Sequence, residues 1–292
     1  MDVAIAVDIG GTKLATAAVD QQGVILRRRR VATPVTGDAE TLWQSVADLV
    51  ADVAGDGEIV VCGAGCGGPM TPNGELVSPL HLPAWRSFPL RERLAESTGV
   101  PAFVDNDAKA VALAEGWRGA AAGETDFLAM VVSTGVGGGL VVDGGLLPGN
   151  AGHVGHVVVR PDGRPCRCGG RGCLEAEVSG TAVAERIGRP SAEAPPDVVA
   201  EAGALVGRAV ASVANVLDLR LAVVAGSVAL GWGAPFLAAA QGELDDRARL
   251  SFSAGARIVL AGLGDDAPLV GAAAVGWRAM GVEVLATQPH PP

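Results

Sequence analysis

Short apolar runs alternate with polar breaks over the first third of the chain, a pattern typical of β-strands joined by tight turns. Three such runs follow one another with only a few turn residues between them, which predicts an antiparallel meander over 3–8, 14–19 and 24–31. A helix is then expected over 41–53, because apolar side chains recur there every three or four residues and acidic residues precede it.

Strand-like and helix-like patterns alternate along the rest of the chain, which indicates an α/β fold. Further strands are predicted over 59–62, 101–104, 128–133, 139–142 and 221–225. Further helices are predicted near 90–97, 107–116 and 200–217, with a short linker at 190–196. Both halves open with strand, glycine turn, strand, which suggests a duplicated core. We therefore expect two α/β domains, 1–117 and 118–292, and allow the final helix to pack back on the first.

The composition changes this picture mainly by exclusion. A chain of 292 residues with 49% hydrophobic and 18% charged residues is that of a folded protein with a sizeable core. A net charge of −10 argues against a nucleic-acid surface, and the basic run 27–30 is best explained as a solvated strand end or turn. No apolar run reaches membrane-spanning length, and from the strand-like pattern that follows Met1 we expect no secretory signal. With five cysteines, an odd number, we expect a cytoplasmic protein.

A glycine-rich stretch between Gly149 and Glu175 concentrates histidines and cysteines at metal-ligand spacing. His153 and His156 precede three cysteines, and the set of four formed by His156, Cys166, Cys168 and Cys173 is a closed ligand set typical of structural Zn²⁺. The alternatives are small buried residues or a disulfide pair, which the polar, turn-rich surroundings disfavour. Cys62 and Cys66 lie elsewhere and are expected to be reduced thiols.

Two glycine turns sit between apolar strands. In the first, formed by Asp8, Ile9, Gly10, Gly11, Thr12 and Lys13, glycines let backbone N–H groups approach an anion and Thr12 adds a hydroxyl. This turn alone could be purely structural. A second turn, 133–139, makes it possible for two hairpins to hold one polyphosphate. A third cluster, 63–68, matches G-x-G-x-x-G formally, but prolines follow where a dinucleotide-binding helix should begin.

Asp105, Asn106 and Asp107 stand where a predicted strand meets a predicted helix. Asp107 is a natural N-cap of that helix. A carboxylate at a strand terminus can also act as general base for a substrate hydroxyl in phosphoryl transfer. Both roles stay open at this point.

Taken together, these motifs resemble the ROK family of bacterial sugar kinases and sugar-responsive repressors. The resemblance rests on the 8–13 turn, the Asn106-Asp107 pair, the 133–139 turn and the Cys-X-Cys-X4-Cys segment, in that order, and it runs from about residue 3 to residue 276. It implies an actin-like, hexokinase-like (ribonuclease H-like) fold of two α/β domains with a structural zinc loop, in which ATP and sugar meet in a cleft.

The resemblance also implies roles for individual residues. Asp107 would be the catalytic base for the 6-hydroxyl of a hexose or hexosamine, with Asp8 near Mg²⁺. The implied sugar-binding residues are Asn106, His153, His156, Glu175, Gly68 and His81. The implied nucleotide-binding residues are Asp8, Gly10, Gly11, Thr12, Lys13, Thr134 and Gly135, with Gly226 and Gly271 resembling adenosine-side turns. We expect a homodimer or homotetramer.

Two departures from the family pattern bear on the substrate. The family usually has Glu at the place of His153, and commonly has Asn at the place of His81. A carboxylate accepts hydrogen bonds from two sugar hydroxyls, whereas a neutral imidazole offers one donor and one acceptor. The histidine at 153 resembles the N-acetylmannosamine kinase branch. His153 could instead orient His156 or bind a loop carbonyl.

The leading hypothesis is an ATP-dependent sugar 6-kinase. A sugar-responsive repressor is expected to carry a helix-turn-helix segment ahead of the first glycine turn, and only seven residues precede Asp8. A non-catalytic sugar-binding or regulatory ROK protein is the remaining alternative, disfavoured by Asp107 and the two intact turns. The sequence does not choose between glucose and N-acetylmannosamine, or between ATP and polyphosphate as phosphoryl donor.

Overall fold

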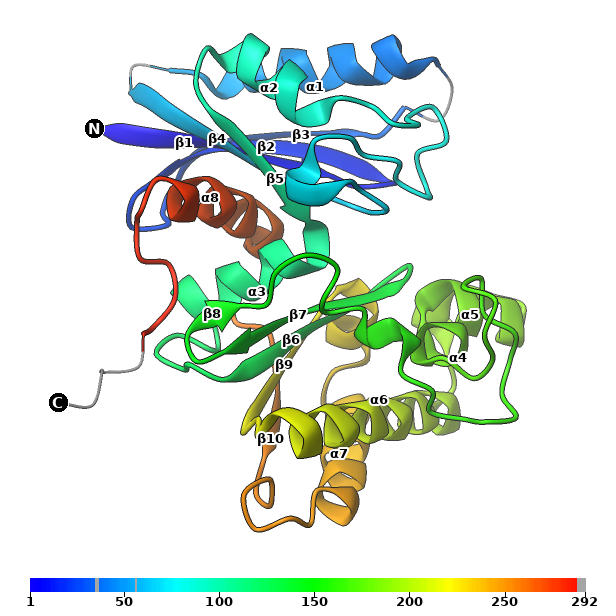
Figure 1. Ribbon diagram of the computed structural model, residues 1–292. Coiled ribbons are helices and arrows are strands. Elements are labelled where there is room, and N and C mark those ends of the chain that lie inside the picture. Colours follow the sequence, from blue (N-terminus) through cyan, green and yellow to red (C-terminus); the bar gives the residue numbers. More distant parts are fainter. Residues whose placement is uncertain (35–36, 56, 288–292) are drawn as a thin grey trace, which may run out of the picture. The chain divides into compact units, whose positions relative to one another are not determined.

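The computed structural model describes residues 1–34, 37–55 and 57–287 (Figure 1). The chain forms two compact units, each built on one five-stranded mixed sheet. Unit 1 consists of Met1–Arg118 and Asp265–Val284, and unit 2 of Gly119–Gly264 together with residues 285–287. The protein is therefore of the α/β class that the sequence predicts.

The sheet of unit 1 begins with the predicted antiparallel meander. Its strands are β1 (Asp2–Ile9), β2 (Lys13–Asp20), β3 (Ile25–Ala32), β4 (Glu58–Cys66) and β5 (Ala102–Asn106), in the order β3-β2-β1-β4-β5. Strands β4 and β5 run parallel to β1. In the register of the sheet, Asp8 pairs with Gly65, which pairs with Asp105. The carboxyl ends of β1, β4 and β5 therefore share one edge, where α/β proteins place their ligands.

Helices cover both faces of this sheet. Helices α1 (Ala39–Val53) and α2 (Leu90–Thr98) lie on one face, while α3 (Asp107–Arg118) and α8 (Ala267–Ala279) lie on the other (Figure 1). The 3₁₀ turn η1 (Pro72–Gly74) lies in the long loop between β4 and α2. In the core on the α1 face, the rings of Trp85 and Phe88 stack with centroids 4.3 Å apart.

Strand β4 is longer than the sequence predicts. The glycine cluster expected to form a loop after residue 62 continues the strand to Cys66. Packing explains the difference, because a Cβ on Gly63 would lie 2.0 Å from the carbonyl oxygen of Ala272 in α8. This glycine allows the helix to approach the strand closely, which local sequence does not reveal. No α-helix follows β4 directly, which agrees with the prolines that come after the G-x-G-x-x-G match.

The sheet of unit 2 repeats the topology of the first. Its strands are β6 (Phe127–Val132), β7 (Val136–Val142), β8 (Gly145–Leu146), β9 (Leu221–Ala225) and β10 (Arg257–Leu260), in the order β10-β9-β6-β7-β8. An antiparallel meander is again followed by two parallel strands. This is the duplicated core that the sequence suggests. Strand β7 begins at Val136, earlier than predicted, because residues 137–139 pair with 129–131 of β6.

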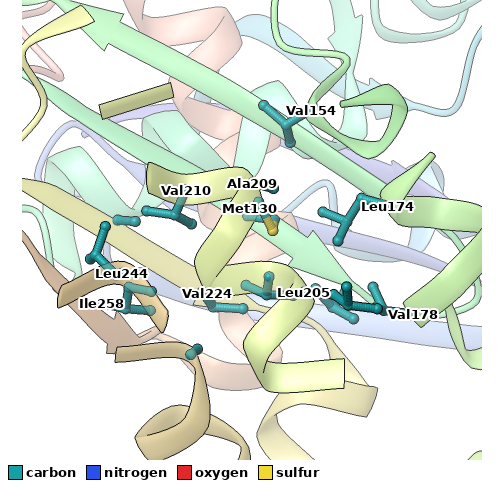
Figure 2. Packing of buried hydrophobic residues seen from close by; sticks show 14 of the residues in the cluster. Met130, Val154, Leu174, Val178, Leu205, Ala209, Val210, Val224, Leu244 and Ile258 are labelled. Carbon is teal, nitrogen blue, oxygen red and sulfur yellow. The ribbon is translucent and has the colours of Figure 1, made fainter. Parts of the chain in front are cut away.

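The helices of unit 2 pack around a common apolar core. They are α4 (Leu174–Val178), α5 (Gly180–Ile187), α6 (Pro196–Leu217) and α7 (Ser227–Arg247), with the short turns η2 (Val154–His156) and η3 (Ser191–Glu193). The turn η4 (Gly264–Asp266) spans the point where the chain passes from unit 2 back to unit 1. The stretch 190–196 is thus a 3₁₀ turn and the start of α6 as well as a linker. Figure 2 shows Leu205 of α6 and Val224 of β9 in the core that also takes in Val154 and Leu174. The segments that carry the histidines and cysteines are therefore anchored in the core.

Within the described residues, no helix combines the length and the apolar character needed to cross a membrane.

Candidate active site and metal centre

Asp107 lies at the junction between β5 and α3. The strand runs through Asn106, and α3 begins at Asp107 itself. The Asn106 Oδ1 accepts the backbone N–H of Ala108 at 3.1 Å, and Asp107 Oδ1 accepts the same N–H at 2.9 Å. The expectation that Asp107 is the N-cap is wrong, because the longer strand makes Asn106 the capping residue. The Asp107 side chain sits in the first turn of the helix.

Two carboxyl groups interact at this edge of the sheet. Burial raises the pKa of Asp107, an effect partly offset by the Ala108 N–H and by His81. Asp8, at the end of β1, is only 7% exposed. Burial and then the negative charge of Asp107 raise the pKa of Asp8 to about 7, against the opposing effect of Lys13. The structure thus brings Asp8, Lys13 and Asp107 together.

The first glycine turn joins β1 to β2 as a short hairpin. The Gly10 N–H donates to the Lys13 carbonyl at 3.1 Å. Thr33, which lies outside the turn, stabilises it by donating its hydroxyl to the Gly10 carbonyl at 2.8 Å. Gly11 and Thr12 are exposed. This exposure leaves the two residues accessible to an anion, as an anion-binding turn requires. Thr33 carries no local sequence signal for this role, since it lies 23 positions from Gly10 along the chain.

His81 packs against two glycines of this region. A Cβ on Gly11 would lie 2.8 Å from the His81 Cδ2, and one on Gly67 would lie 3.0 Å from the His81 Nε2 and 3.8 Å from the Asp107 Oδ2. The imidazole and the carboxylate therefore approach the same point of the backbone after β4, next to Gly68. His81 is exposed, so its ring is available to a ligand.

The second glycine turn, in unit 2, is tied to two helices. The Ser133 N–H donates to the Gly135 carbonyl at 2.9 Å, and the Thr134 carbonyl accepts the Thr181 hydroxyl at 3.0 Å. The Ser133 and Ser227 hydroxyls lie 3.0 Å apart at the start of α7. Because β7 starts at Val136, the turn is shorter than the predicted 133–139. Neither Thr181 nor Ser227 was expected, although both stand near helix starts that follow glycines.

The two glycines expected near adenosine have different environments. Gly226 lies between β9 and α7 with φ of +98°, and a Cβ there would lie 2.3 Å from the Val132 carbonyl oxygen. Gly271 is not in a turn, contrary to the prediction. It is buried in α8, where a Cβ would lie 2.1 Å from the Ala110 carbonyl oxygen of α3. It allows two helices to pack closely, which leaves it no surface for a nucleotide.

Glu175 contacts the second glycine turn. Its Oε2 accepts the Val136 N–H at 3.0 Å, and its side chain is half-buried. It is the second residue of α4, which begins directly after Cys173.

The predicted metal ligands converge. One ligand atom from each of His156, Cys166, Cys168 and Cys173 lies within 4.8 Å of the others. The His156 Nδ1 is 3.7 Å from the Cys166 Sγ, and the Sγ atoms of Cys168 and Cys173 are also 3.7 Å apart. Tetrahedral Zn²⁺ with Zn–S bonds of about 2.3 Å gives S···S edges of about 3.8 Å. Three sulfurs and one imidazole nitrogen therefore fit Zn²⁺ in both geometry and chemistry.

The cysteines are free, which excludes the disulfide alternative. The Gly170 N–H donates to the Cys168 Sγ at 3.4 Å and lowers the pKa of that thiol, whereas burial raises the pKa of Cys173 to about 12. Outside the cluster, Cys62 and Cys66 are buried and free, as predicted, and burial raises the pKa of both.

His153 lies beside the cluster without joining it. Its ring centroid is 6.1 Å from that of His156, and both side chains are exposed. Since the Nδ1 of His156 faces the cysteines, its Nε2 is the atom left for another partner.

The structure thus defines a two-unit α/β protein with two glycine turns between strands, a pair of interacting carboxyl groups and a Cys3His cluster. Residues 4–278 match the sequence profile of the ROK family, and the chain belongs to that family. It is 39% identical over 184 residues to the glucokinase of Thermotoga maritima, covering 61% of this chain and 58% of that one. It is 34% identical to the N-acetylmannosamine kinase of Escherichia fergusonii, covering 78% of this chain and 84% of the relative.

A solved structure agrees. The ROK family glucokinase from Streptomyces griseus, in complex with glucose and AMPPNP, superimposes with a TM-score of 0.80 and 29% identity, covering 94% of this chain and 99% of that one. The two-unit, hexokinase-like fold is confirmed.

Proposed function

We propose that this protein is an ATP-dependent carbohydrate kinase that phosphorylates the 6-hydroxyl of a hexose or hexosamine. The observation that carries the proposal is Asp107, a half-buried carboxylate at a strand end beside an anion-binding turn. A general base works best when its pKa approaches the working pH, and burial moves the pKa of Asp107 in that direction. The kinase names of the relatives support the same class of reaction.

In the proposed reaction, Asp107 accepts the proton of the sugar 6-hydroxyl. The sugar oxygen forms a bond to the γ-phosphorus while the bond from that phosphorus to the bridging oxygen breaks, and ADP leaves with the bond's electron pair. The Gly10–Thr12 backbone, Lys13, Thr134 and Gly135 would hold the phosphates. Asp8, a buried oxygen donor at the end of β1, fits a role near Mg²⁺, which would neutralise charge on the phosphates.

Six residues are proposed to take part in sugar recognition. Gly68, His81 and Asn106 belong to unit 1, and His153, His156 and Glu175 belong to unit 2. Histidine at 153 favours a substrate with an acetamido group, as in N-acetylmannosamine, over plain glucose, because an imidazole N–H can donate to the amide carbonyl.

We also propose that the Cys3His cluster binds structural Zn²⁺. The ion would fix His156 and, through Cys173 at the start of α4, Glu175. Its role would be to shape the sugar-binding residues, since four protein ligands leave no open position for substrate.

The test is a coupled ADP-release assay with glucose, mannose, glucosamine, N-acetylmannosamine and N-acetylglucosamine. Asp107→Asn keeps the shape of the side chain and removes its basicity, so turnover should fall by about 10²- to 10⁴-fold while sugar affinity stays nearly unchanged. Asp52→Asn, which removes an exposed carboxylate on α1, is the matched control and should keep full activity. Turnover of Asp107→Asn within twofold of the unmodified protein would reject Asp107 as the base.

A further inference from the structure

The carboxylate of Glu175 accepts a hydrogen bond from the backbone at the end of the second glycine turn. Its Oε2 accepts the Val136 N–H at 3.0 Å, and a Cβ on Gly135 would lie 2.9 Å from the same oxygen. A negatively charged group thus lies against a turn whose proposed ligand is also negative. Two anions in such proximity repel each other unless something shares the charge.

Glu175 is firmly held where it stands. It follows Cys173 and Leu174 at the start of α4, and the Leu174 N–H donates to the Val157 carbonyl at 2.9 Å. Leu174 is fully buried in the core of unit 2 (Figure 2). The backbone that carries Glu175 is therefore anchored in the core, and the carboxylate itself is held at the turn by the Val136 N–H.

Val136 is enclosed on its other side as well. A Cβ on Gly155 would lie 2.2 Å from the Val136 carbonyl oxygen, so the 153–156 segment is packed against it. Across the described residues, the Val136 N–H is the hydrogen-bond partner of the Glu175 side chain, and that bond uses Oε2. The other oxygen, Oε1, is left for a ligand.

We propose that Glu175 couples sugar binding to nucleotide binding, with Oε1 for a sugar hydroxyl and Oε2 for the phosphate turn. The inference rests on the proposed function. A hydroxyl that donates to Oε1 draws negative charge away from Oε2 and reduces the repulsion at the turn. Sugar then raises the affinity for the nucleotide triphosphate, and linkage requires the nucleotide to raise the affinity for sugar by the same factor.

The experiment measures binding without turnover. The full chain is titrated with AMP-PNP and Mg²⁺ by calorimetry, alone, with saturating glucose and with saturating N-acetylmannosamine. We expect at least about a fivefold gain in AMP-PNP affinity with the sugar that binds, the lower end of common coupling between sites. Glu175→Gln removes the charge and keeps an oxygen to accept the Val136 N–H. It should bind AMP-PNP more tightly than the unmodified protein without sugar, and sugar should add no further gain.

A second variant alters the contact between Glu175 and the turn by a substitution in the turn itself. Gly135→Ala places a methyl group against the Glu175 carboxylate and should reduce the coupling factor. Gly242→Ala in α7, where a Cβ meets nothing within 4 Å, is the matched control and should keep it. Thermal melts verify that each variant is folded, and Gly135→Ala carries the test if Glu175→Gln does not fold.

The outcomes separate this inference from the proposed function. If both sugar and AMP-PNP bind and sugars are phosphorylated, but the coupling factor is one or survives in Glu175→Gln, only the inference is overturned. If no sugar in the panel binds or is phosphorylated, the proposed function is rejected and the inference with it.

Discussion

Asp8 gives the most direct energetic test of the carboxylate pair, because the protein should become more stable when its charge is removed. The pKa of Asp8 is raised from 3.8 to about 7. Three units correspond to about 4 kcal/mol at 1.36 kcal/mol per unit. Between these two pKa values the folded state holds a proton that the unfolded state has lost. The free energy of unfolding therefore falls as pH rises from about 4 to about 7, and stays reduced above.

Asp8→Asn is neutral at every pH and does not incur this cost. We expect its free energy of unfolding to exceed that of the unmodified protein by up to about 4 kcal/mol at pH 8, with the difference shrinking towards zero near pH 4. Urea unfolding at a series of pH values, without added Mg²⁺ or nucleotide, measures the difference. Asp52→Asn, on exposed α1 surface, controls for the loss of one carboxylate. Equal stabilities of Asp8→Asn and the unmodified protein from pH 5 to pH 8 would refute the argument.

Two predictions concern unit 2. Cys166→Ser or Cys168→Ser should release Zn²⁺ and, by displacing His156 and Glu175, weaken sugar binding before nucleotide binding; metal analysis of purified, active protein checks this, and about zero equivalents before mutation would contradict it. His153→Glu should shift relative kcat/KM from an N-acylated hexose towards glucose by about tenfold to a hundredfold, since a carboxylate cannot donate a hydrogen bond to the amide carbonyl but can accept from sugar hydroxyls. An equal loss on all sugars would instead give His153 a role in orienting its neighbours.

Periodicity predicts much of this fold because both sheets use amphipathic or fully apolar strands. The antiparallel meander of unit 1 and strand β9 appear where the sequence places them. The incorrect predictions of secondary structure concern glycine residues. In β4, Gly63 and Gly65 look like a loop, yet they lie within a strand because helices pack against their bare backbone. Gly271 is misassigned for the same reason, since a glycine that allows close packing and one that forms a turn have the same local sequence signal.

The candidate site also contains residues that the sequence predicts and residues that it does not. The metal ligands follow from spacing, because four ligands in a short segment can meet only around one ion, and the 4.8 Å cluster agrees. The supports of the turns could not be predicted. Thr33, Thr181 and Ser227 hold turn residues through hydrogen bonds between positions 21 or more apart in the sequence, and only the folded chain brings such positions together.

His81 links substrate choice to the chemistry of the base. The family resemblance leads us to expect Asn there, a residue without charge. The imidazole lies against Gly11 and Gly67 and lowers the pKa of Asp107, in opposition to burial. With Asn in its place, that opposing effect would be lost and Asp107 would take up its proton at a higher pH. In the proposed function, where His81 contacts the sugar and Asp107 is the base, the histidine also keeps Asp107 ionised to lower pH. We therefore expect a change of substrate at this position to bring a change in the pH dependence of turnover.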